Sequence, residues 1–294
     1  MTGMFDRFNC ASPATVSLPP VVRSTFLALL SCTIKSNLPG TINRAAQTLI
    51  VYLLSTMPVS AEKYASIIID DLGNSYEYGH DIISLPGALT LAILPRTIYA
   101  RELARLAIKN HKEVMLHLPM QSVENQKPSP GTLDLHMTRQ EFIRQLRLNL
   151  NSVPYVRGVN NHMGSLLTRH PGHMSWLMDE LGKQGGLYFV DSKTTSKSIA
   201  DMIAVEYRIP SLSRDYFLDP DFDENTIRQQ FDRFLKRVHQ RGYALAIAHP
   251  HPNTIRFLQQ HLSELSEQGI TLIPVSRLIH DANSATQQLA ATED

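Results

Sequence analysis

The most constraining feature of this sequence is an alternation, from residue 65 onward, of short apolar runs with segments of helical periodicity. The clearest run is ALAIA at residues 244–248. Apolar runs without polar alternation are typical of parallel strands that are buried on both faces of a sheet. The pattern therefore predicts an α/β fold. The candidate strands lie at residues 65–70, 89–94, 113–118, 156–160, 187–191, 210–214, 244–248 and 270–274.

The segments between these runs carry helix start and stop signals. Thr138 and Glu141 have the spacing of a capping box. Gly242 is placed to end a helix over residues 224–241, and a further helix is expected over residues 253–268. These helices present apolar stripes toward a core.

Strands interleaved with helices predict a distorted (β/α) barrel of seven or eight mostly parallel strands. An open doubly wound sheet is the alternative. The chain of 294 residues has no internal repeat and no linker within this region. We therefore expect a single barrel domain over residues 62–280, followed by a flexible tail over residues 281–294.

Residues 42–61 have the features of a secretory signal peptide. Arg44 precedes an apolar stretch at residues 49–54, and Val59-Ser60-Ala61 resembles a cleavage site. The stretch is too short for a stable membrane span, so the mature chain is expected to begin near residue 62 and to be periplasmic or secreted. A buried helix is the alternative. Residues 1–41 lie upstream of the proposed signal peptide. They are expected to be an extension that is either disordered or the product of a start assigned too early.

Composition narrows the possible partners and chemistry. The formal net charge is +1 and aromatic residues make up only 7% of the chain, which disfavours nucleic acid as a partner. Both cysteines, Cys10 and Cys32, precede the proposed cleavage site. Disulfides, thiolate metal sites and cysteine nucleophiles are therefore excluded for the mature domain.

Polar residues recur where the predicted strands end. Asp70 and Asp71 follow the first strand, and buried carboxylates are costly unless they are paired or bind a metal. The carboxyl ends of barrel strands meet at one rim, although one aspartate could simply cap the next helix. The other residues at these ends are His117, Asn160, Asn161, His162, Asp191, Arg214, Asp215 and His249.

Asp70, Asp71, His117, His162 and His249 together suit a hydrolytic metal site. One aspartate and two histidines can bind a divalent ion, most often zinc, and leave a position open for water. A second carboxylate can then act as a base, and a further histidine can protonate the leaving group. The alternative is a metal-free network of hydrogen bonds. The remaining histidines are expected in solvated helices, turns and loops, and the long loop 121–135 is expected to overhang the site.

The sequence from Ser66 to Leu278 resembles the divergent polysaccharide deacetylase family, relatives of the chitin-oligosaccharide and peptidoglycan deacetylases. The motifs that carry the resemblance are IDDLG at residues 69–73, HLPM at 117–120, NNHMGS at 160–165 and AHPHP at 248–252. The resemblance implies a distorted barrel and metal-dependent removal of acetyl groups from an N-acetyl sugar.

The resemblance also implies roles for individual residues. Asp70 would be the base, Asp71 and His117 metal ligands, and His249 the general acid. The better-known enzymes have a second metal histidine where this chain has Gln121. Their arginine-and-proline motif on the fourth strand is replaced by residues 160–162, and we expect His162 to supply the missing ligand from there.

We expect Asn161, Asp191 and Arg214 to contact substrate at the same rim. The preferred function is an exported metal-dependent deacetylase of a cell-envelope or amino-sugar glycan. The alternative is a carbohydrate-binding or cell-envelope protein on the same fold that has little or no turnover. A glycosidase using Asp70 with Asp191 or Asp215 ranks last, because that chemistry does not need the histidines.

Overall fold

The computed structural model of the protein describes residues 62–124 and 128–290, with side chains described as far as Ala282. The predicted extension at residues 1–41 and the predicted signal peptide at residues 42–61 lie outside the described residues. No helix in the described ranges is long and apolar enough to span a membrane.

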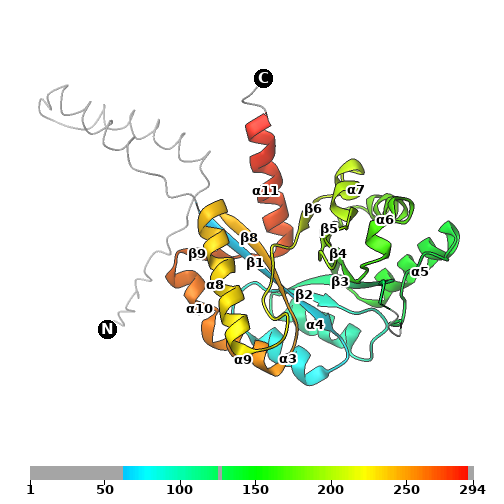
Figure 1. Ribbon diagram of the computed structural model, residues 1–294. Coiled ribbons are helices and arrows are strands. Elements are labelled where there is room, and N and C mark those ends of the chain that lie inside the picture. Colours follow the sequence, from blue (N-terminus) through cyan, green and yellow to red (C-terminus); the bar gives the residue numbers. More distant parts are fainter. Residues whose placement is uncertain (1–61, 125–127, 291–294) are drawn as a thin grey trace, which may run out of the picture. The chain divides into compact units, whose positions relative to one another are not determined.

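The described residues form one curled parallel sheet with helices packed around it, which confirms the predicted distorted (β/α) barrel (Figure 1). The strand order is β6-β5-β4-β3-β2-β1-β8-β7, and β9 pairs with β1. The strands are β1 (Lys63–Leu72), β2 (Thr90–Ile93), β3 (Glu113–Met120), β4 (Val156–Met163), β5 (Tyr188–Asp191), β6 (Ser211–Ser213), β7 (Tyr216–Phe217), β8 (Tyr243–Ala248) and β9 (Ile270–Leu272).

The helices follow their sequence signals closely. The capping box at Thr138 and Glu141 begins α5, and Gly242, with φ of 85°, ends α8. The helix predicted over residues 253–268 is in fact two, since α9 ends at His261 and α10 begins at Ser263. The helices are α3 (Tyr76–Ser84), α4 (Ala100–Lys109), α5 (Arg139–Ser152), α6 (Pro171–Gln184), α7 (Ala200–Glu206), α8 (Glu224–Arg241), α9 (Pro252–His261), α10 (Ser263–Glu267) and α11 (Val275–Ala290), with a 3-10 turn, η1 (Leu167–Arg169).

A two-residue crossing joins the two ends of the sheet. β6 pairs with β5, and β7 pairs with β8, yet only Arg214 and Asp215 separate β6 from β7. The Arg214 N–H donates to the Asp191 carbonyl (3.0 Å), and the Asp215 N–H donates to the Leu245 carbonyl (2.9 Å). Because two residues reach only about 7 Å, the curl of the sheet must bring β5 and β8 close together.

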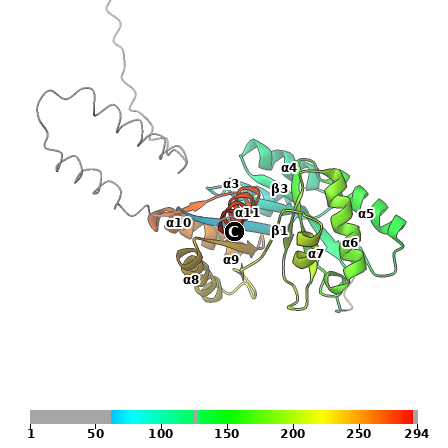
Figure 2. The same cartoon turned by 90° about the horizontal axis from the view of Figure 1, so that it is seen from above.

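Helix α11 fills the end of the barrel where the strands begin. Leu278 and Ile279 pack inside the curl with Ile68 and Leu245. The Val275 N–H donates to Thr90 Oγ1 at the start of β2 (3.1 Å). Figure 2 views this helix nearly end-on beside β1. The helix continues to Ala290, past the predicted domain end at residue 280.

Candidate active site

A β-bulge brings both aspartates of β1 to the site. The register with β2 shifts between Ile69 and Leu72, and Asp71 has a left-handed φ of 58°. Successive strand residues normally point to opposite faces. Ile68 lies in the inner core, so Asp70 points inward by alternation, and the bulge returns Asp71 to the same side. A non-glycine residue in this backbone region is typical of functional sites.

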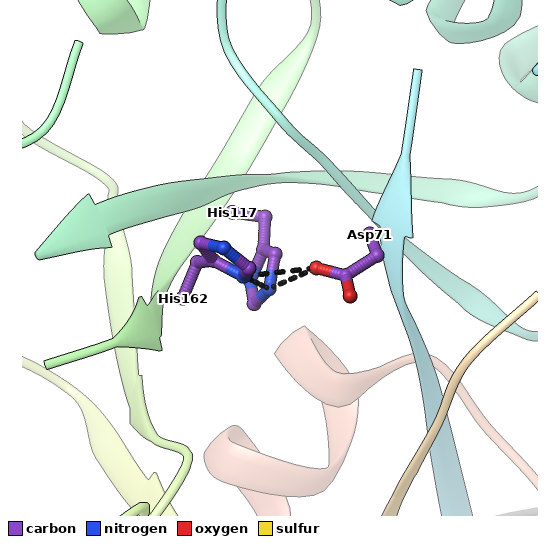
Figure 3. Close-up of side chains that lie close together, drawn as sticks. All are labelled: Asp71, His117 and His162. Carbon is purple, nitrogen blue, oxygen red and sulfur yellow. Dashed lines mark hydrogen bonds and ion pairs between the residues drawn. The ribbon is translucent and has the colours of Figure 1, made fainter. Parts of the chain in front are cut away.

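Asp71, His117 and His162 converge on one point from the ends of β1, β3 and β4 (Figure 3). Asp71 Oδ1 lies 3.1 Å from His117 Nε2 and 2.9 Å from His162 Nδ1. The two imidazole nitrogens are 3.1 Å apart. His117 is buried, whereas 38% of the Asp71 side chain is exposed, so the cluster lies at the edge of the interior and not deep within it.

This triad fits a divalent cation. Ligand atoms about 2.0–2.1 Å from a tetrahedral zinc lie roughly 3.3 Å from one another, which is close to the three distances observed here. Asp71 Oδ1 is buried and makes no geometrically acceptable hydrogen bond within the described part of the chain. A buried carboxylate oxygen that faces two imidazole nitrogens is therefore a good partner for a metal ion.

Asn160 fixes the His117 ring for this role. Its Nδ2 donates to Asp70 Oδ1 (2.7 Å), so its Oδ1 is left to accept from His117 Nδ1 (2.8 Å). His117 therefore carries its proton on Nδ1 and presents the Nε2 lone pair to the triad. The placement follows from the sheet, because His117 and Asn160 are register partners on β3 and β4.

The two aspartates have opposite electrostatic surroundings. Burial raises the pKa of Asp70, and this effect exceeds the lowering by His117 and His249. Burial also raises the pKa of Asp71, but its contacts with His117 and His162 outweigh burial and hold that pKa far below the ordinary value. Asp71 is thus ionised, as a ligand must be, while Asp70 is the better proton acceptor.

His249 is held by Asp219, a residue that our sequence analysis missed. Asp219 Oδ1 lies 2.9 Å from His249 Nδ1, and its other oxygen accepts from the His249 N–H (2.7 Å) and from Thr254 Oγ1 (2.8 Å). Burial lowers the pKa of His249, but the carboxylates of Asp219, Asp70 and Asp71 raise it to about 9. Asp219 follows the two-residue strand β7, whose brevity hid it from any periodicity search.

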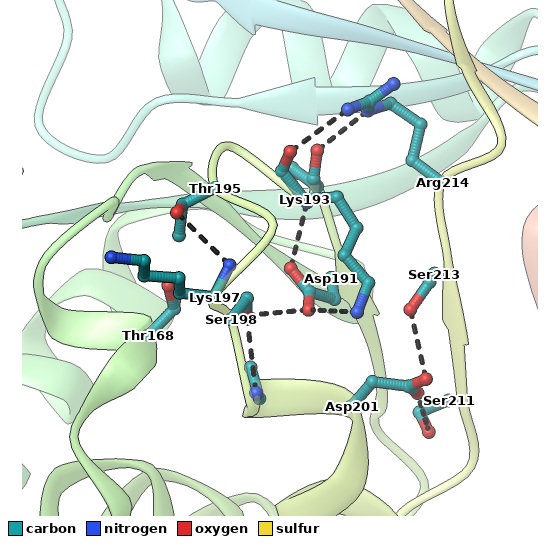
Figure 4. Close-up of polar contacts among 12 residues, drawn as sticks. Thr168, Asp191, Lys193, Thr195, Lys197, Ser198, Asp201, Ser211, Ser213 and Arg214 are labelled. Carbon is teal, nitrogen blue, oxygen red and sulfur yellow. Dashed lines mark hydrogen bonds and ion pairs between the residues drawn. The ribbon is translucent and has the colours of Figure 1, made fainter.

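The residues expected to contact substrate make hydrogen bonds within the protein, as Figure 4 shows for Asp191 and Arg214. Asn161 accepts from the Ser192 N–H (2.9 Å) and donates to the Met163 carbonyl (2.8 Å). Asp191 is fully buried and accepts from Ser198 Oγ (2.7 Å). Both side chains thus hold the loop after β5, and their predicted contact with substrate stays a prediction.

Gln121 takes part in the loop that follows β3. Its Oε1 accepts from the Leu135 N–H (2.9 Å), so its side chain is tied within the loop. The loop overhangs the site as predicted, with Ser129 Oγ 3.5 Å from His162 Nε2. The position where the resemblance implies a second metal histidine thus holds a glutamine bound to the loop, while His162 on β4 lies beside His117.

One histidine was misjudged from sequence. We expected His173 on a solvated helix face, but it is buried and packs against Phe142 and Trp176, with ring centroids 5.6 and 4.4 Å away. Its ring lies on the outer side of the sheet, where α5 packs against α6. It has no contact with the triad.

The chain has relatives among known proteins. The chain is 37% identical to the uncharacterized protein YibQ of Escherichia coli over 229 residues, which are 78% of this chain and 71% of YibQ. It is 35% identical to an uncharacterized protein of Haemophilus influenzae over 74% of this chain and 77% of that protein. The fold matches the crystal structure of the uncharacterized protein ATU2773 from Agrobacterium tumefaciens C58, with a TM-score of 0.71 and 22% identity over 76% of this chain and 91% of that one. The sequence model of one family, described as divergent polysaccharide deacetylase, matches residues 67–279. With the strand-end motifs that carry the site all inside this range, the chain belongs to the divergent polysaccharide deacetylase family.

Proposed function

We propose that the protein is an exported, metal-dependent hydrolase that removes N-acetyl groups from an amino-sugar glycan of the cell envelope. The observation that carries the proposal is the triad of Asp71, His117 and His162, whose three ligand atoms lie about 3 Å apart. Membership of the deacetylase family supports a glycan as the substrate class.

Residues around the triad can supply the proton transfers of amide hydrolysis. A divalent ion held by the triad would polarise the amide carbonyl and acidify a water. Asp70 accepts the proton that this water loses as it adds to the carbonyl carbon. His249, protonated at neutral pH, donates a proton to the sugar nitrogen as the C–N bond breaks. The products are acetate and a free amino sugar, and Asp219 is the positioning residue for His249.

Metal content and turnover should be measured on the same protein. Purified mature chain should contain about one zinc or similar ion and should release acetate from acetylated chito-oligosaccharides or peptidoglycan fragments. His162→Ala should lower metal affinity strongly because a three-ligand site has no spare ligand. His80→Ala, on the exposed surface of α3, is the matched control. Full metal affinity in His162→Ala would contradict the proposed ligand set.

Export rests on the sequence alone. Arg44, the apolar stretch at residues 49–54 and Val59-Ser60-Ala61 support cleavage near Glu62. Mass spectrometry of the protein from fractionated cells should find the mature N-terminus in the periplasm or the medium. An intact N-terminus in cytoplasmic protein would argue against export.

A second candidate is a glycan-binding protein of the same fold without turnover. It is favoured by Asn160, a neutral amide that donates to Asp70 and lies in the segment that replaces the arginine-and-proline motif implied by the resemblance. Protein that binds chito-oligosaccharide but contains no metal and releases no acetate would support this candidate.

A further inference from the structure

Arg214 is a half-buried cation that one aromatic ring separates from His249, and it makes no ion pair with any described residue. Its guanidinium stacks on the Phe217 ring, 3.6 Å from the ring centroid. That ring lies 5.8 Å from the His249 ring. No carboxylate oxygen in the described part of the chain lies within 4.0 Å of the guanidinium. A charge withdrawn from water without a counter-ion is costly.

The nearby carboxylates are already engaged. Asp191 lies 3.4 Å from Lys193 Nζ and also accepts from Ser198 Oγ. Asp215 lies 3.5 Å from Arg241 Nη1. Burial lowers the pKa of Arg214 to about 10, against the opposing effect of these carboxylates and of Asp70. Asp191 and Asp215 therefore each lie within 4.0 Å of another cation and not of Arg214.

The Arg214 guanidinium is held in a fixed orientation and has N–H donors that are not used. Nε donates to the Ser192 carbonyl (2.7 Å) and Nη2 donates to the Lys193 carbonyl (3.1 Å), as Figure 4 shows. An arginine has five N–H donors, so three have no partner within the described ranges. A rigid fork of this kind is preorganised to bind a planar or tetrahedral oxyanion.

Ser192, whose carbonyl accepts from Arg214, also carries an unsatisfied hydroxyl. β5 directs Tyr188 and Val190 into the inner core, and the alternation of strand residues places Ser192 on that side. Ser192 is only 1% exposed, and its Oγ has no hydrogen-bond partner among the described residues. A buried hydroxyl is usually satisfied by a protein group, a water or a ligand.

We propose that Arg214 and Ser192 form a subsite for an anionic substituent, a carboxylate or a phosphate, on the sugar that enters the site. This inference rests on the proposed function because it names the substrate class of the same site. Arg214 contacts the anion directly. The Ser192 hydroxyl donates a hydrogen bond to the anion or to a water that the anion binds. The preferred substrate is therefore an acidic amino sugar and not a neutral one.

Binding of three sugars to the zinc-loaded protein tests the subsite. The probes are N-acetylglucosamine, N-acetylmuramic acid and N-acetylglucosamine 6-phosphate, titrated by calorimetry at low salt. At least one anionic sugar should bind about tenfold or more tightly than the neutral sugar, and the better of the two identifies the anion. Arg214→Gln should lose this preference while it keeps affinity for the neutral sugar. Arg277→Gln removes the same charge from α11 and should change nothing.

Equal affinity of wild-type protein for all three sugars would overturn the inference. So would an equal loss for all three sugars in Arg214→Gln, because a purely loop-holding arginine would act in that way. Should Arg214→Gln fail to fold, Ser192→Ala carries the test, with a smaller loss that must again be confined to the anionic sugars. Binding is read without turnover, so selective binding by protein that releases no acetate would contradict the proposed hydrolysis and leave the subsite standing.

Discussion

Asp70 and Asp71 are neighbours in the chain, yet their surroundings suit different tasks. Asp71 faces two imidazoles, whereas Asp70 accepts a hydrogen bond from an uncharged amide and is only 2% exposed. A ligand must stay ionised, and a base works best when its pKa approaches the working pH. The pKa of Asp70 is raised and that of Asp71 is lowered, which are the directions that the proposed roles of base and metal ligand require.

Asparagine at each position should separate these tasks. Asp71→Asn should lose metal and activity together, because an amide is a poor ligand for a cation held by two histidines. Asp70→Asn should keep the metal and lose turnover by about 10²–10⁴-fold, since an amide cannot accept the water proton. Metal content and acetate release are measured on both variants, with Asp81→Asn on α3 as the control. If Asp70→Asn stays metal-loaded and active, Asp70 is not the base.

The Asp219–His249 pair should set the alkaline limit of activity and part of the stability. Without a metal the pKa of His249 is raised to about 9, so its acid form persists at neutral pH, and activity should fall at alkaline pH as that form is lost. An unfolded histidine titrates near about 6.5. In metal-free protein the pair should therefore stabilise the fold fully below pH 6.5 and lose that contribution as the pH rises through 9.

Asp219→Asn removes the carboxylate and should shift the alkaline limit of activity to lower pH. Rate profiles and thermal melts between pH 6 and 10 measure both effects. Asp81→Asn again controls for the loss of one negative charge. An alkaline limit that does not move would mean that a group other than His249 governs it.

The bulge of β1 depends on the glycine that follows it. Gly73 has φ of 122°, and a Cβ there would overlap the Thr97 side chain. Leu94 N–H donates to the Leu72 carbonyl (2.8 Å), and Tyr99 N–H donates to the Gly73 carbonyl (3.0 Å). This turn is therefore fixed on both sides of the glycine, and it sets the position of Asp71.

Gly73→Ala should destabilise the protein by roughly 1–3 kcal/mol from backbone strain alone and should weaken metal binding because Asp71 moves. The double variant Gly73→Ala/Thr97→Ala should recover part of the stability, since it removes the overlap with the hydroxyl but not the strain in φ. Urea unfolding and zinc titration measure both quantities. Unchanged zinc affinity in Gly73→Ala would show that the bulge does not position the ligand.

The barrel as a whole was readable from sequence because its strands are buried on both faces. Every predicted strand is present, and residues 69–73 and 160–165 lie at strand ends as expected. The features that the sequence did not predict are either very short or depend on contacts between distant parts of the chain. β7 has two residues, too few for periodicity, and Asp219 was missed with it. The bond between Asn160 and His117 depends on the register of two strands, which no single segment encodes.

The division of the C-terminal region was misjudged for a similar reason. A continuous apolar stripe predicted one helix over residues 253–268, but the chain breaks at Leu262 to begin α10. Helix α11 extends past the predicted domain end at residue 280. Its first residue, Val275, is bonded to Thr90, 185 positions earlier, and no local pattern encodes such a contact.

The crossing between β6 and β7 has a consequence for how the family can vary in length. Elsewhere, a helix between strands can gain or lose a turn while the strands that it joins stay in place. Between Ser213 and Tyr216 there is no such slack, because backbone hydrogen bonds on both sides fix Arg214 and Asp215. One inserted residue would reverse which side chains face inward from there to Asp219. Insertions and deletions among relatives should therefore be tolerated in the α/β connections. They should be rare over residues 211–219, where the sheet permits substitutions but not a change in the number of residues.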